Sequence, residues 1–335
     1  MLAGCHTRRI AAAYRISLKQ WISTAQNNIT YHMGLDASGR HVVQTALILA
    51  DNTRLTYGDL SKQVASMVTL LHVTFGLNRG DRVLSRVEKS VDSLVLYLAT
   101  LRLGAVYVPL NPAYTLTETI NFVKDSDPHL FVSCNIKQDE IFANTVEHVM
   151  DSTAFFNRSR RVKPDYGVEC VKSDDVACIC YTSGTTGSPK GAMITHGGLT
   201  WNAKTLVDMW KFSQKDVLLH MLPFDHVHGM FISLNCTLFT KSSVIFRPKF
   251  DVNDALNWLP KCTVMMGVPT YYSRLMQRSN FDKDLTRNVR VFISGSAPLS
   301  TVLWEDFKQR TGHEILERYG MTEGCILLLI ILFYL

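Results

Sequence analysis

The chain alternates helical and strand-like segments along most of its length, and this alternation limits the possible folds more than any other feature. Residues 91 to 103 have the apolar spacing of a helix that ends at Gly104, and residues 105 to 110 have the pattern of a strand. A second pair follows at residues 116 to 124 and 129 to 133. Helices that alternate with strands predict parallel sheets with helices on both faces.

The alternation resumes after the polar segment from Asn157 to Asp175, the best candidate for a linker. We therefore predict an α/β fold of two similar lobes, about residues 40–156 and 176–323. Thr56 with Asp59 predicts the start of an earlier helix. In the second lobe, helices are expected at 198–211, 230–239, 254–259, 271–277 and 299–310, and strands at 217–222, 244–246, 263–266 and 289–293.

The segment YTSGTTGSPKGA, residues 181 to 192, is the strongest local signal for a ligand, and an apolar strand-like run at 176 to 180 precedes it. Glycines let a backbone approach closely, hydroxyl and N–H groups donate to phosphate oxygens, and the Lys190 ammonium offsets negative charge. Pro189 stands where the common P-loop needs its second glycine. We predict a different polyphosphate-binding loop; the alternative is an ordinary flexible surface loop.

The composition indicates a globular protein whose main partner is not nucleic acid. The 335 residues are 47% hydrophobic and 19% charged, which suits a packed core. The net charge is +6, but four basic residues precede the first acidic residue, so the remainder carries only +2. These four are Arg8, Arg9, Arg15 and Lys19. A nearly neutral remainder argues against a basic surface for a phosphate backbone.

Residues 1 to 25 are rich in arginine, alanine and serine and contain no acidic residue. This composition is typical of a mitochondrial transit peptide, and no apolar core of a secretory signal is present. We expect a mitochondrial matrix protein. The alternative is that residues 1 to 25 are a plain disordered N-terminus and that the protein is cytoplasmic. The eight cysteines contain no CxxC pair and are expected to be reduced thiols.

The chain ends in an apolar run, CILLLIILFYL, from residue 325 to residue 335. Crossing a bilayer as a helix takes about 20 residues, so this run predicts no transmembrane span. A buried strand would be followed by turn residues and more protein. We therefore interpret residues 324 to 335 as an aberrant apolar tail on a truncated chain.

Four further motifs each follow an expected strand, and ligands of open α/β sheets gather at the carboxyl ends of strands. They are LPFDHVHGM (222–230), GVPTYYSRL (267–275), ISGSAPLS (293–300) and ERYGMTEG (317–324). Together with YTSGTTGSPKGA they make the chain resemble the AMP-forming acyl-CoA synthetases of the adenylate-forming superfamily. The resemblance implies the large N-terminal, AMP-binding domain of that fold over residues 26–323, without the smaller C-terminal domain.

Enzymes of this family activate a carboxylic acid with ATP and transfer the acyl group to CoA. The resemblance implies that Lys190 holds the departing pyrophosphate, that Thr322 binds the α-phosphate, and that Glu323 coordinates Mg²⁺, a hard cation that prefers oxygen ligands. Tyr319 is expected to stack on adenine. The β- and γ-phosphates are assigned to Thr182, Ser183, Gly184, Thr185, Thr186 and Gly187, and the adenine edge to Gly295, Ser296 and Ala297.

Within the family the motifs are most similar to those of malonate–CoA ligases. Malonate keeps a second carboxylate, and burying that charge without a partner is very costly. A guanidinium can bind it through two parallel hydrogen bonds. Arg274 is the first candidate and Arg318 the second, and Ser294 adds a hydroxyl. A solvated Arg274 on an exposed helix is the alternative, as is an acyl-CoA synthetase for another acid.

Two histidines of the second motif need separate treatment. As a strand pair, His226 and His228 would face one way and suggest a metal site, but no third ligand is apparent. The family resemblance instead implies that His226 lines and gates the acyl site, while His228 supports packing.

The family continues beyond ERYGMTE with a TGD segment that holds the ribose, a hinge, and a C-terminal domain with a catalytic lysine, none of which is found in this sequence. We therefore expect this chain to lack the complete reaction cycle and to be unstable. The alternatives are a sequence incomplete at its C-terminus and a natural short isoform that binds nucleotide or a partner.

Overall fold

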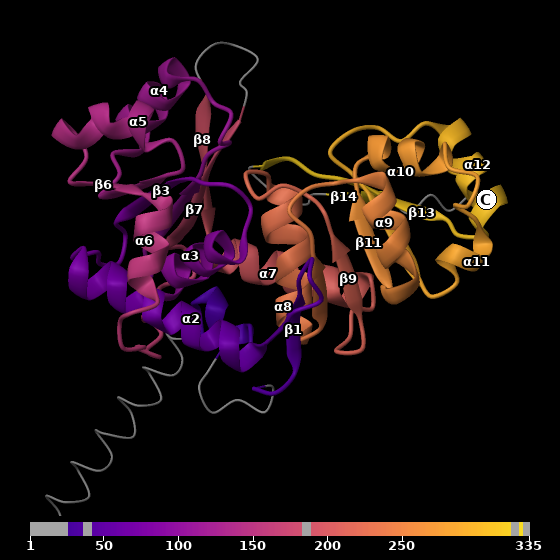
Figure 1. Ribbon diagram of the computed structural model, residues 1–335, viewed down its shortest axis with the longest axis horizontal. Coiled ribbons are helices and arrows are strands. Elements are labelled where there is room, and N and C mark those ends of the chain that lie inside the picture. Colours follow the sequence, from indigo (N-terminus) through magenta and orange to yellow (C-terminus); the bar gives the residue numbers. More distant parts are fainter. Residues whose placement is uncertain (1–25, 36–41, 183–188, 323–327, 331–335) are drawn as a thin grey trace, which may run out of the picture.

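The computed structural model describes residues 26–35, 42–182, 189–322 and 328–330, which form two sheets side by side (Figure 1). The six-stranded sheet has the order β6-β5-β3-β4-β7-β8, and the eight-stranded sheet has the order β14-β13-β12-β11-β9-β10-β1-β2. All pairings are parallel except the three at the edges, β7–β8, β1–β2 and β13–β14. The predicted α/β fold with mainly parallel sheets is confirmed.

The strands of both sheets are short, and β4, β5, β11 and β12 in the interior of the sheets are completely buried. The six-stranded sheet contains β3 (Arg82–Arg86), β4 (Val106–Pro109), β5 (Leu130–Ser133), β6 (His148–Asp151), β7 (Val176–Thr182) and β8 (Lys190–Thr195). The eight-stranded sheet contains β1 (Thr45–Ile48), β2 (Arg54–Thr56), β9 (Val217–His220), β10 (Ser243–Phe246), β11 (Val264–Gly267), β12 (Val291–Ser294), β13 (Ile315–Tyr319) and β14 (Leu328–Ile330).

Most of the α-helices begin where the sequence supplies a capping side chain; α5, α8 and α10 do not. Thr56, Ser90 and Thr115 each form a capping box at the first turn of α2, α3 and α4. The α-helices are α2 (Tyr57–Thr69), α3 (Val91–Arg102), α4 (Leu116–Ser126), α5 (Ile136–Asp139), α6 (Ser152–Ser159), α7 (His196–Met209), α8 (Asn235–Thr240), α9 (Val252–Trp258), α10 (Pro269–Met276), α11 (Lys283–Thr286) and α12 (Thr301–Thr311).

Sheet membership crosses the predicted boundary between the lobes in both directions. The early strand β1 pairs in parallel with β10, Leu47 opposite Val244, and so joins the eight-stranded sheet. The hairpin β7–β8 pairs through Cys178 with Tyr107 of β4 and joins the six-stranded sheet. A sheet edge with unpaired backbone groups accepts any strand of matching shape, regardless of its distance in the sequence.

The polar segment between α6 and β7, predicted as a linker, is fastened to the first lobe. Arg102 at the end of α3 is buried, and its guanidinium donates to the carbonyl oxygens of Tyr166 and Gly167 at 2.5 and 2.8 Å. The backbone N–H of Asp165 donates to Ala65 of α2 at 3.0 Å. The segment is thus part of the folded surface.

Among the described residues, no helix is both long and apolar enough to cross a membrane. The described cysteines are free thiols, as predicted. The predicted leader, residues 1–25, lies outside the described residues. Of the predicted apolar tail, residues 328–330 form β14, which pairs antiparallel with β13, and the rest lies outside the described residues.

A buried histidine makes the stability of this fold dependent on pH. His196, the first residue of α7, is fully buried, and its Nδ1 accepts a hydrogen bond from the backbone N–H of Ile29 at 3.3 Å. Burial lowers the pKa of His196 to about 4. The neutral imidazole therefore suits the folded state, whereas the unfolded chain binds a proton near pH 6.5.

We expect the free energy of unfolding to fall as the pH drops from about 6.5 to about 4, by about 3 kcal/mol from His196 alone. Urea denaturation at several pH values in this range measures the slope of the free energy of unfolding against pH. His196→Gln should make this slope smaller, whereas His72→Gln, at an exposed position, should not. Equal slopes in the wild type and His196→Gln would contradict the assignment.

Candidate functional site

A cavity of about 420 Å³ lies at the carboxyl ends of β9, β11, β12 and β13. Residues from all four motifs of the eight-stranded sheet line it, although they are far apart in the sequence. The lining consists of Leu222, Pro223, His226, Val227, His228, Gly229, Val268, Ser296, Arg318, Gly320, Met321 and Thr322. The expected convergence at one sheet edge is therefore present, with His226, Ser296, Arg318 and Thr322 around one cavity.

Arg318 is the charged group in the wall of this cavity, and only 5% of its surface is exposed. Its Nη2 donates to Ser296 Oγ at 3.3 Å, while its buried Nε has no hydrogen-bond partner. Burial lowers the pKa of Arg318 to about 10, so the guanidinium stays positive at neutral pH. No carboxylate among the described residues forms an ion pair with it, and an unpaired buried cation favours an anionic ligand.

The ISGSAPLS motif shapes the space around this guanidinium. A Cβ atom on Gly295 would lie 2.4 Å from Arg318 Nε, so any larger residue would displace the arginine. Ser296 has a φ of +68°, in the left-handed region that is uncommon for residues other than glycine. Glu317 accepts a hydrogen bond from the Leu299 N–H at 2.9 Å and ties this motif to β13.

The two histidines of LPFDHVHGM line the same cavity in different environments. The His226 side chain is 68% exposed, and its Nε2 lies 3.7 Å from Asp225 Oδ2. His228 is buried, its Nδ1 lies 3.3 Å from Ser296 Oγ, and its Nε2 has no partner. Burial, followed by the charge of Arg318, lowers the pKa of His228 well below its ordinary value. The neutral His228 thus fits beside the cation.

These histidines do not lie on a strand, which removes the geometric basis of the metal alternative. β9 ends at His220, and His228 begins a π-helical segment that runs to Leu234. The sequence pattern of alternate residues on one strand face therefore does not apply to His226 and His228. An exposed side chain and a buried one share the cavity wall instead.

Sequence reasoning missed two residues that hold the histidine motif in place. The ring of His220 is buried, and its Nε2 lies 2.7 Å from the Gly229 carbonyl oxygen. Its Nδ1 lies 2.8 Å from Lys89 Nζ, from the first lobe. A Cβ on Gly229 would lie 1.9 Å from the Pro223 carbonyl oxygen, so only glycine fits there. The glycine in HGM was the one local signal of this close approach.

The phosphate-loop motif is described only at its two ends. Thr182 ends β7 and lies opposite Lys190, which begins β8 with an exposed side chain. Neither residue is among those that line the cavity. Residues 183–188, including Ser183, Gly184, Thr185, Thr186 and Gly187, lie outside the described residues, as does Glu323.

The remaining predicted residues do not line the cavity. The hydroxyl of Ser294, at the end of β12, is buried without a partner. Tyr319 is 53% exposed and Ala297 is exposed. Arg274 on α10 is exposed, its guanidinium carbon lies 5.2 Å from the centre of the Phe250 ring, and it does not line the cavity.

The chain is similar to malonate–CoA ligases in sequence. The protein named Malonate–CoA ligase from Arabidopsis thaliana is 31% identical over 320 residues, which span 82% of this chain and 53% of that protein. The mitochondrial Malonate–CoA ligase ACSF3 of Mus musculus is 40% identical over 168 residues, 45% of this chain and 28% of that protein. This chain thus spans at most about half the length of these two relatives.

Solved structures show the same fold. ATP-bound MatB from Rhodopseudomonas palustris matches with a TM-score of 0.84 and 40% sequence identity over 90% of this chain and 61% of that chain. The inhibitor-bound N-terminal domain of FACL13 from Mycobacterium tuberculosis has a TM-score of 0.81 at 24% identity and supports the fold alone. Residues 36–333 match the family described as AMP-binding enzyme. The chain belongs to this family of AMP-binding enzymes.

Proposed function

We propose that this chain is the ATP- and acid-binding part of an acid–thiol ligase, with malonate as the acid. The observation that carries the proposal is Arg318, a buried cation without a carboxylate partner among the described residues, in the wall of the cavity where four motifs meet. The similarity to malonate–CoA ligases and to ATP-bound MatB supports the same substrates.

The proposed reaction has two steps. A malonate oxygen attacks the α-phosphorus of ATP, the bond to the bridging oxygen breaks, and pyrophosphate leaves. The CoA thiolate then attacks the carbonyl carbon, and AMP leaves with the bonding electron pair. Because both first-step reactants are anions, the protein must position them and offset charge.

In this scheme Thr182 and Lys190 contribute to the pyrophosphate site and Thr322 contacts the α-phosphate. Tyr319 would stack on adenine, with the backbone of residues 295–297 along the edge of the base. Mg²⁺ would neutralise phosphate charge, and its predicted ligand Glu323 lies outside the described residues.

We assign the second malonate carboxylate to Arg318, beside the Ser296 hydroxyl that its Nη2 contacts, and Ser294 stays a predicted source of a further hydroxyl. Of the two arginines nominated by the sequence, Arg318 lines the cavity, whereas Arg274 is exposed. The role of Arg274 stays a prediction, and the same assay tests it.

The test is titration of the purified chain with non-hydrolysable malonyl- and acetyl-adenylate analogues. We expect binding of the malonyl analogue to be at least about tenfold tighter, because a buried charge-assisted hydrogen bond contributes about 1.5–3 kcal/mol. Equal affinities for the malonyl and acetyl analogues would contradict the assignment of malonate as the substrate. Failure to bind either analogue, in a chain that melts cooperatively, would contradict nucleotide binding itself. Tighter binding of another acyl analogue would identify a ligase for that acid.

We also propose a mitochondrial location. The arginine-rich composition of residues 1–25 and the mitochondrial relatives from mouse and human support it. Imaging of the chain fused at its C-terminus to a fluorescent protein tests this proposal. A diffuse cytoplasmic signal would contradict it.

A further inference from the structure

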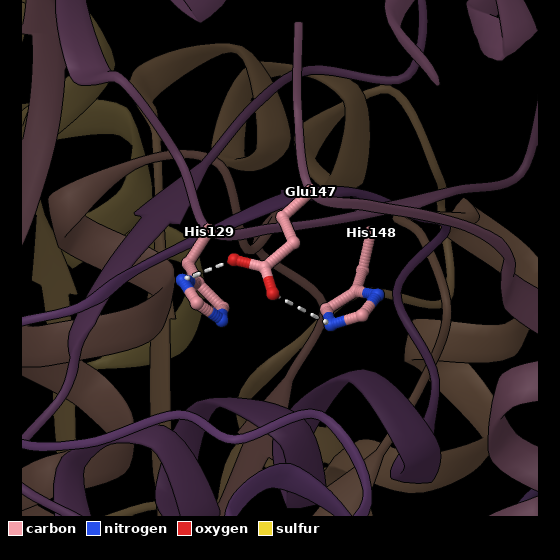
Figure 2. A group of neighbouring side chains, drawn as sticks. All are labelled: His129, Glu147 and His148. Atoms are coloured by element: carbon pink, nitrogen blue, oxygen red, sulfur yellow. Dashed lines mark ion pairs between the residues drawn. The ribbon is translucent and has the colours of Figure 1, made fainter. Parts of the chain in front are cut away.

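Two histidines and a glutamate converge on the first lobe, away from the cavity described above (Figure 2). His129 lies just before β5, and Glu147 and His148 lie at the start of β6. These are the amino-terminal ends of neighbouring parallel strands, whereas the proposed substrate cavity uses carboxyl ends in the other sheet. The backbone N–H of His148 donates to the His129 carbonyl at 3.2 Å and holds the two segments together.

The donor atoms of the three side chains point toward one another. The carboxylate of Glu147 lies between the rings, with Oε2 3.3 Å from His129 Nδ1 and Oε1 3.6 Å from His148 Nε2 (Figure 2). One ligand atom from each residue lies within 4.8 Å of the other two. Two ligands at about 2.0–2.1 Å from a tetrahedral ion are about 3.3 Å apart, so small side-chain movements would complete a site.

The contact on the side of the His129 ring that faces away from Glu147 determines which ring nitrogen is free to bind a metal ion. Its Nε2 lies 3.1 Å from the backbone carbonyl oxygen of Phe75. A carbonyl oxygen can only accept, so a hydrogen bond there places the ring proton on Nε2 and leaves the Nδ1 lone pair facing Glu147. Metal-binding histidines in proteins commonly donate their second N–H to a backbone carbonyl in this way.

Phe75 also supports the imidazole of His148. The ring of Phe75 packs edge-on against His148 with ring centres 5.1 Å apart. The backbone and side chain of Phe75 therefore each contact one histidine of the cluster. Because both imidazoles are held from outside the cluster, an ion would find its ligands largely preorganised.

We infer that His129, Glu147 and His148 bind a zinc ion or a similar first-row dication. Two imidazoles and one carboxylate form a donor set suited to Zn²⁺, which would keep one position for water or an external ligand. The side chains are 24%, 61% and 31% exposed in the same order, so an ion can reach them from solvent. The bound ion would fasten β5 to β6 at this edge of the six-stranded sheet.

A different reading of the cluster is a pair of surface ion pairs between Glu147 and protonated histidines. Such exposed pairs contribute little to stability. Such pairs need no zinc, whereas an ion that binds only the folded chain raises its melting temperature further as the free ion concentration rises above the dissociation constant. The two readings therefore differ in a measurable way.

The experiment is a zinc titration of the chelator-treated full chain against a chromophoric competitor, with thermal melting in parallel. We expect one Zn²⁺ per chain at this site and a higher melting temperature with zinc. Cobalt in its place should give the strong visible absorption of a tetrahedral site. His129→Gln and His148→Gln should each abolish the zinc-dependent rise in melting temperature.

The matched control is His313→Gln, a partly buried histidine of the other lobe, which should bind zinc as the wild type does. Far-UV circular dichroism with chelator checks that all variants fold. Zinc bound to the wild type but equally to a His129→Gln/His148→Gln double variant would place the ion elsewhere. A folded wild type without zinc-dependent stabilisation would also overturn the inference.

Discussion

Asp139→Ala is expected to lower the free energy of unfolding by about 3–5 kcal/mol, because it leaves a buried guanidinium without its counter-ion. Asp139 and Arg86 are both buried, and Arg86 Nη1 lies 2.9 and 3.0 Å from the two carboxylate oxygens. Ser133 Oγ donates to the same carboxylate at 2.5 Å. The pair thereby joins the ends of β3 and β5 to α5.

The loss of stability in Asp139→Ala should exceed the loss expected from the Arg86–Asp139 pair alone, because Arg86 also holds the loop after β4. Its guanidinium donates to the carbonyl oxygen of Pro112 at 3.1 Å and to that of Tyr114. This loop carries Asn111, whose amide donates to Asp225 at 2.8 Å, next to His226. An Arg86 without its counter-ion would therefore disturb the contact between the two lobes.

Urea denaturation followed by circular dichroism measures the change. The matched control is Glu314→Ala, which removes the exposed Lys308–Glu314 pair of 2.7 Å and should cost less than about 1 kcal/mol. Asp139→Asn keeps the shape of the side chain and a hydrogen-bond acceptor, so its loss of stability should lie between those of Asp139→Ala and Glu314→Ala. Similar losses for Asp139→Ala and Glu314→Ala would show that burial does not determine the cost of breaking this pair.

Arg318→Gln is expected to weaken binding of the malonyl-adenylate analogue by about 30-fold to several thousand-fold, which corresponds to about 2–5 kcal/mol. The same change should leave the free energy of unfolding unchanged or raise it, because it removes a buried cation that no described carboxylate neutralises. A purely structural arginine would give the opposite result, namely lower stability with affinity lost only through unfolding.

Comparison with Arg274→Gln separates the two candidates for the carboxylate clamp. Arg274 is exposed beside Phe250, so we expect this change to alter the preference for malonyl over acetyl analogues much less than Arg318→Gln does. Isothermal titration of both variants with both analogues measures the preference. If Arg274→Gln alone abolished the preference, the assignment made from the sequence would be correct and Arg318 would have another role.

Much of the local structure was predictable because its causes lie within a few residues of each other. Thr56 and Asp59 are three positions apart and form the capping box that starts α2. The helix expected at 116–124 extends to Ser126, and its C-cap Asp127 adopts a left-handed conformation. Each motif follows a strand, and the carboxyl ends of parallel strands lie at one edge of the sheet. The meeting of the motifs was therefore predictable as well.

The sequence alone determined the alternating pattern, the helix starts and the set of motifs that meet at a cavity, since each depends on neighbouring residues. Only the tertiary structure decided that β1 pairs with β10 and that Arg318 is buried whereas Arg274 is exposed. It also placed His129 beside Glu147 and His148. Burial and contact between distant segments depend on which surfaces remain uncovered after the sheets assemble, and no local pattern records that outcome.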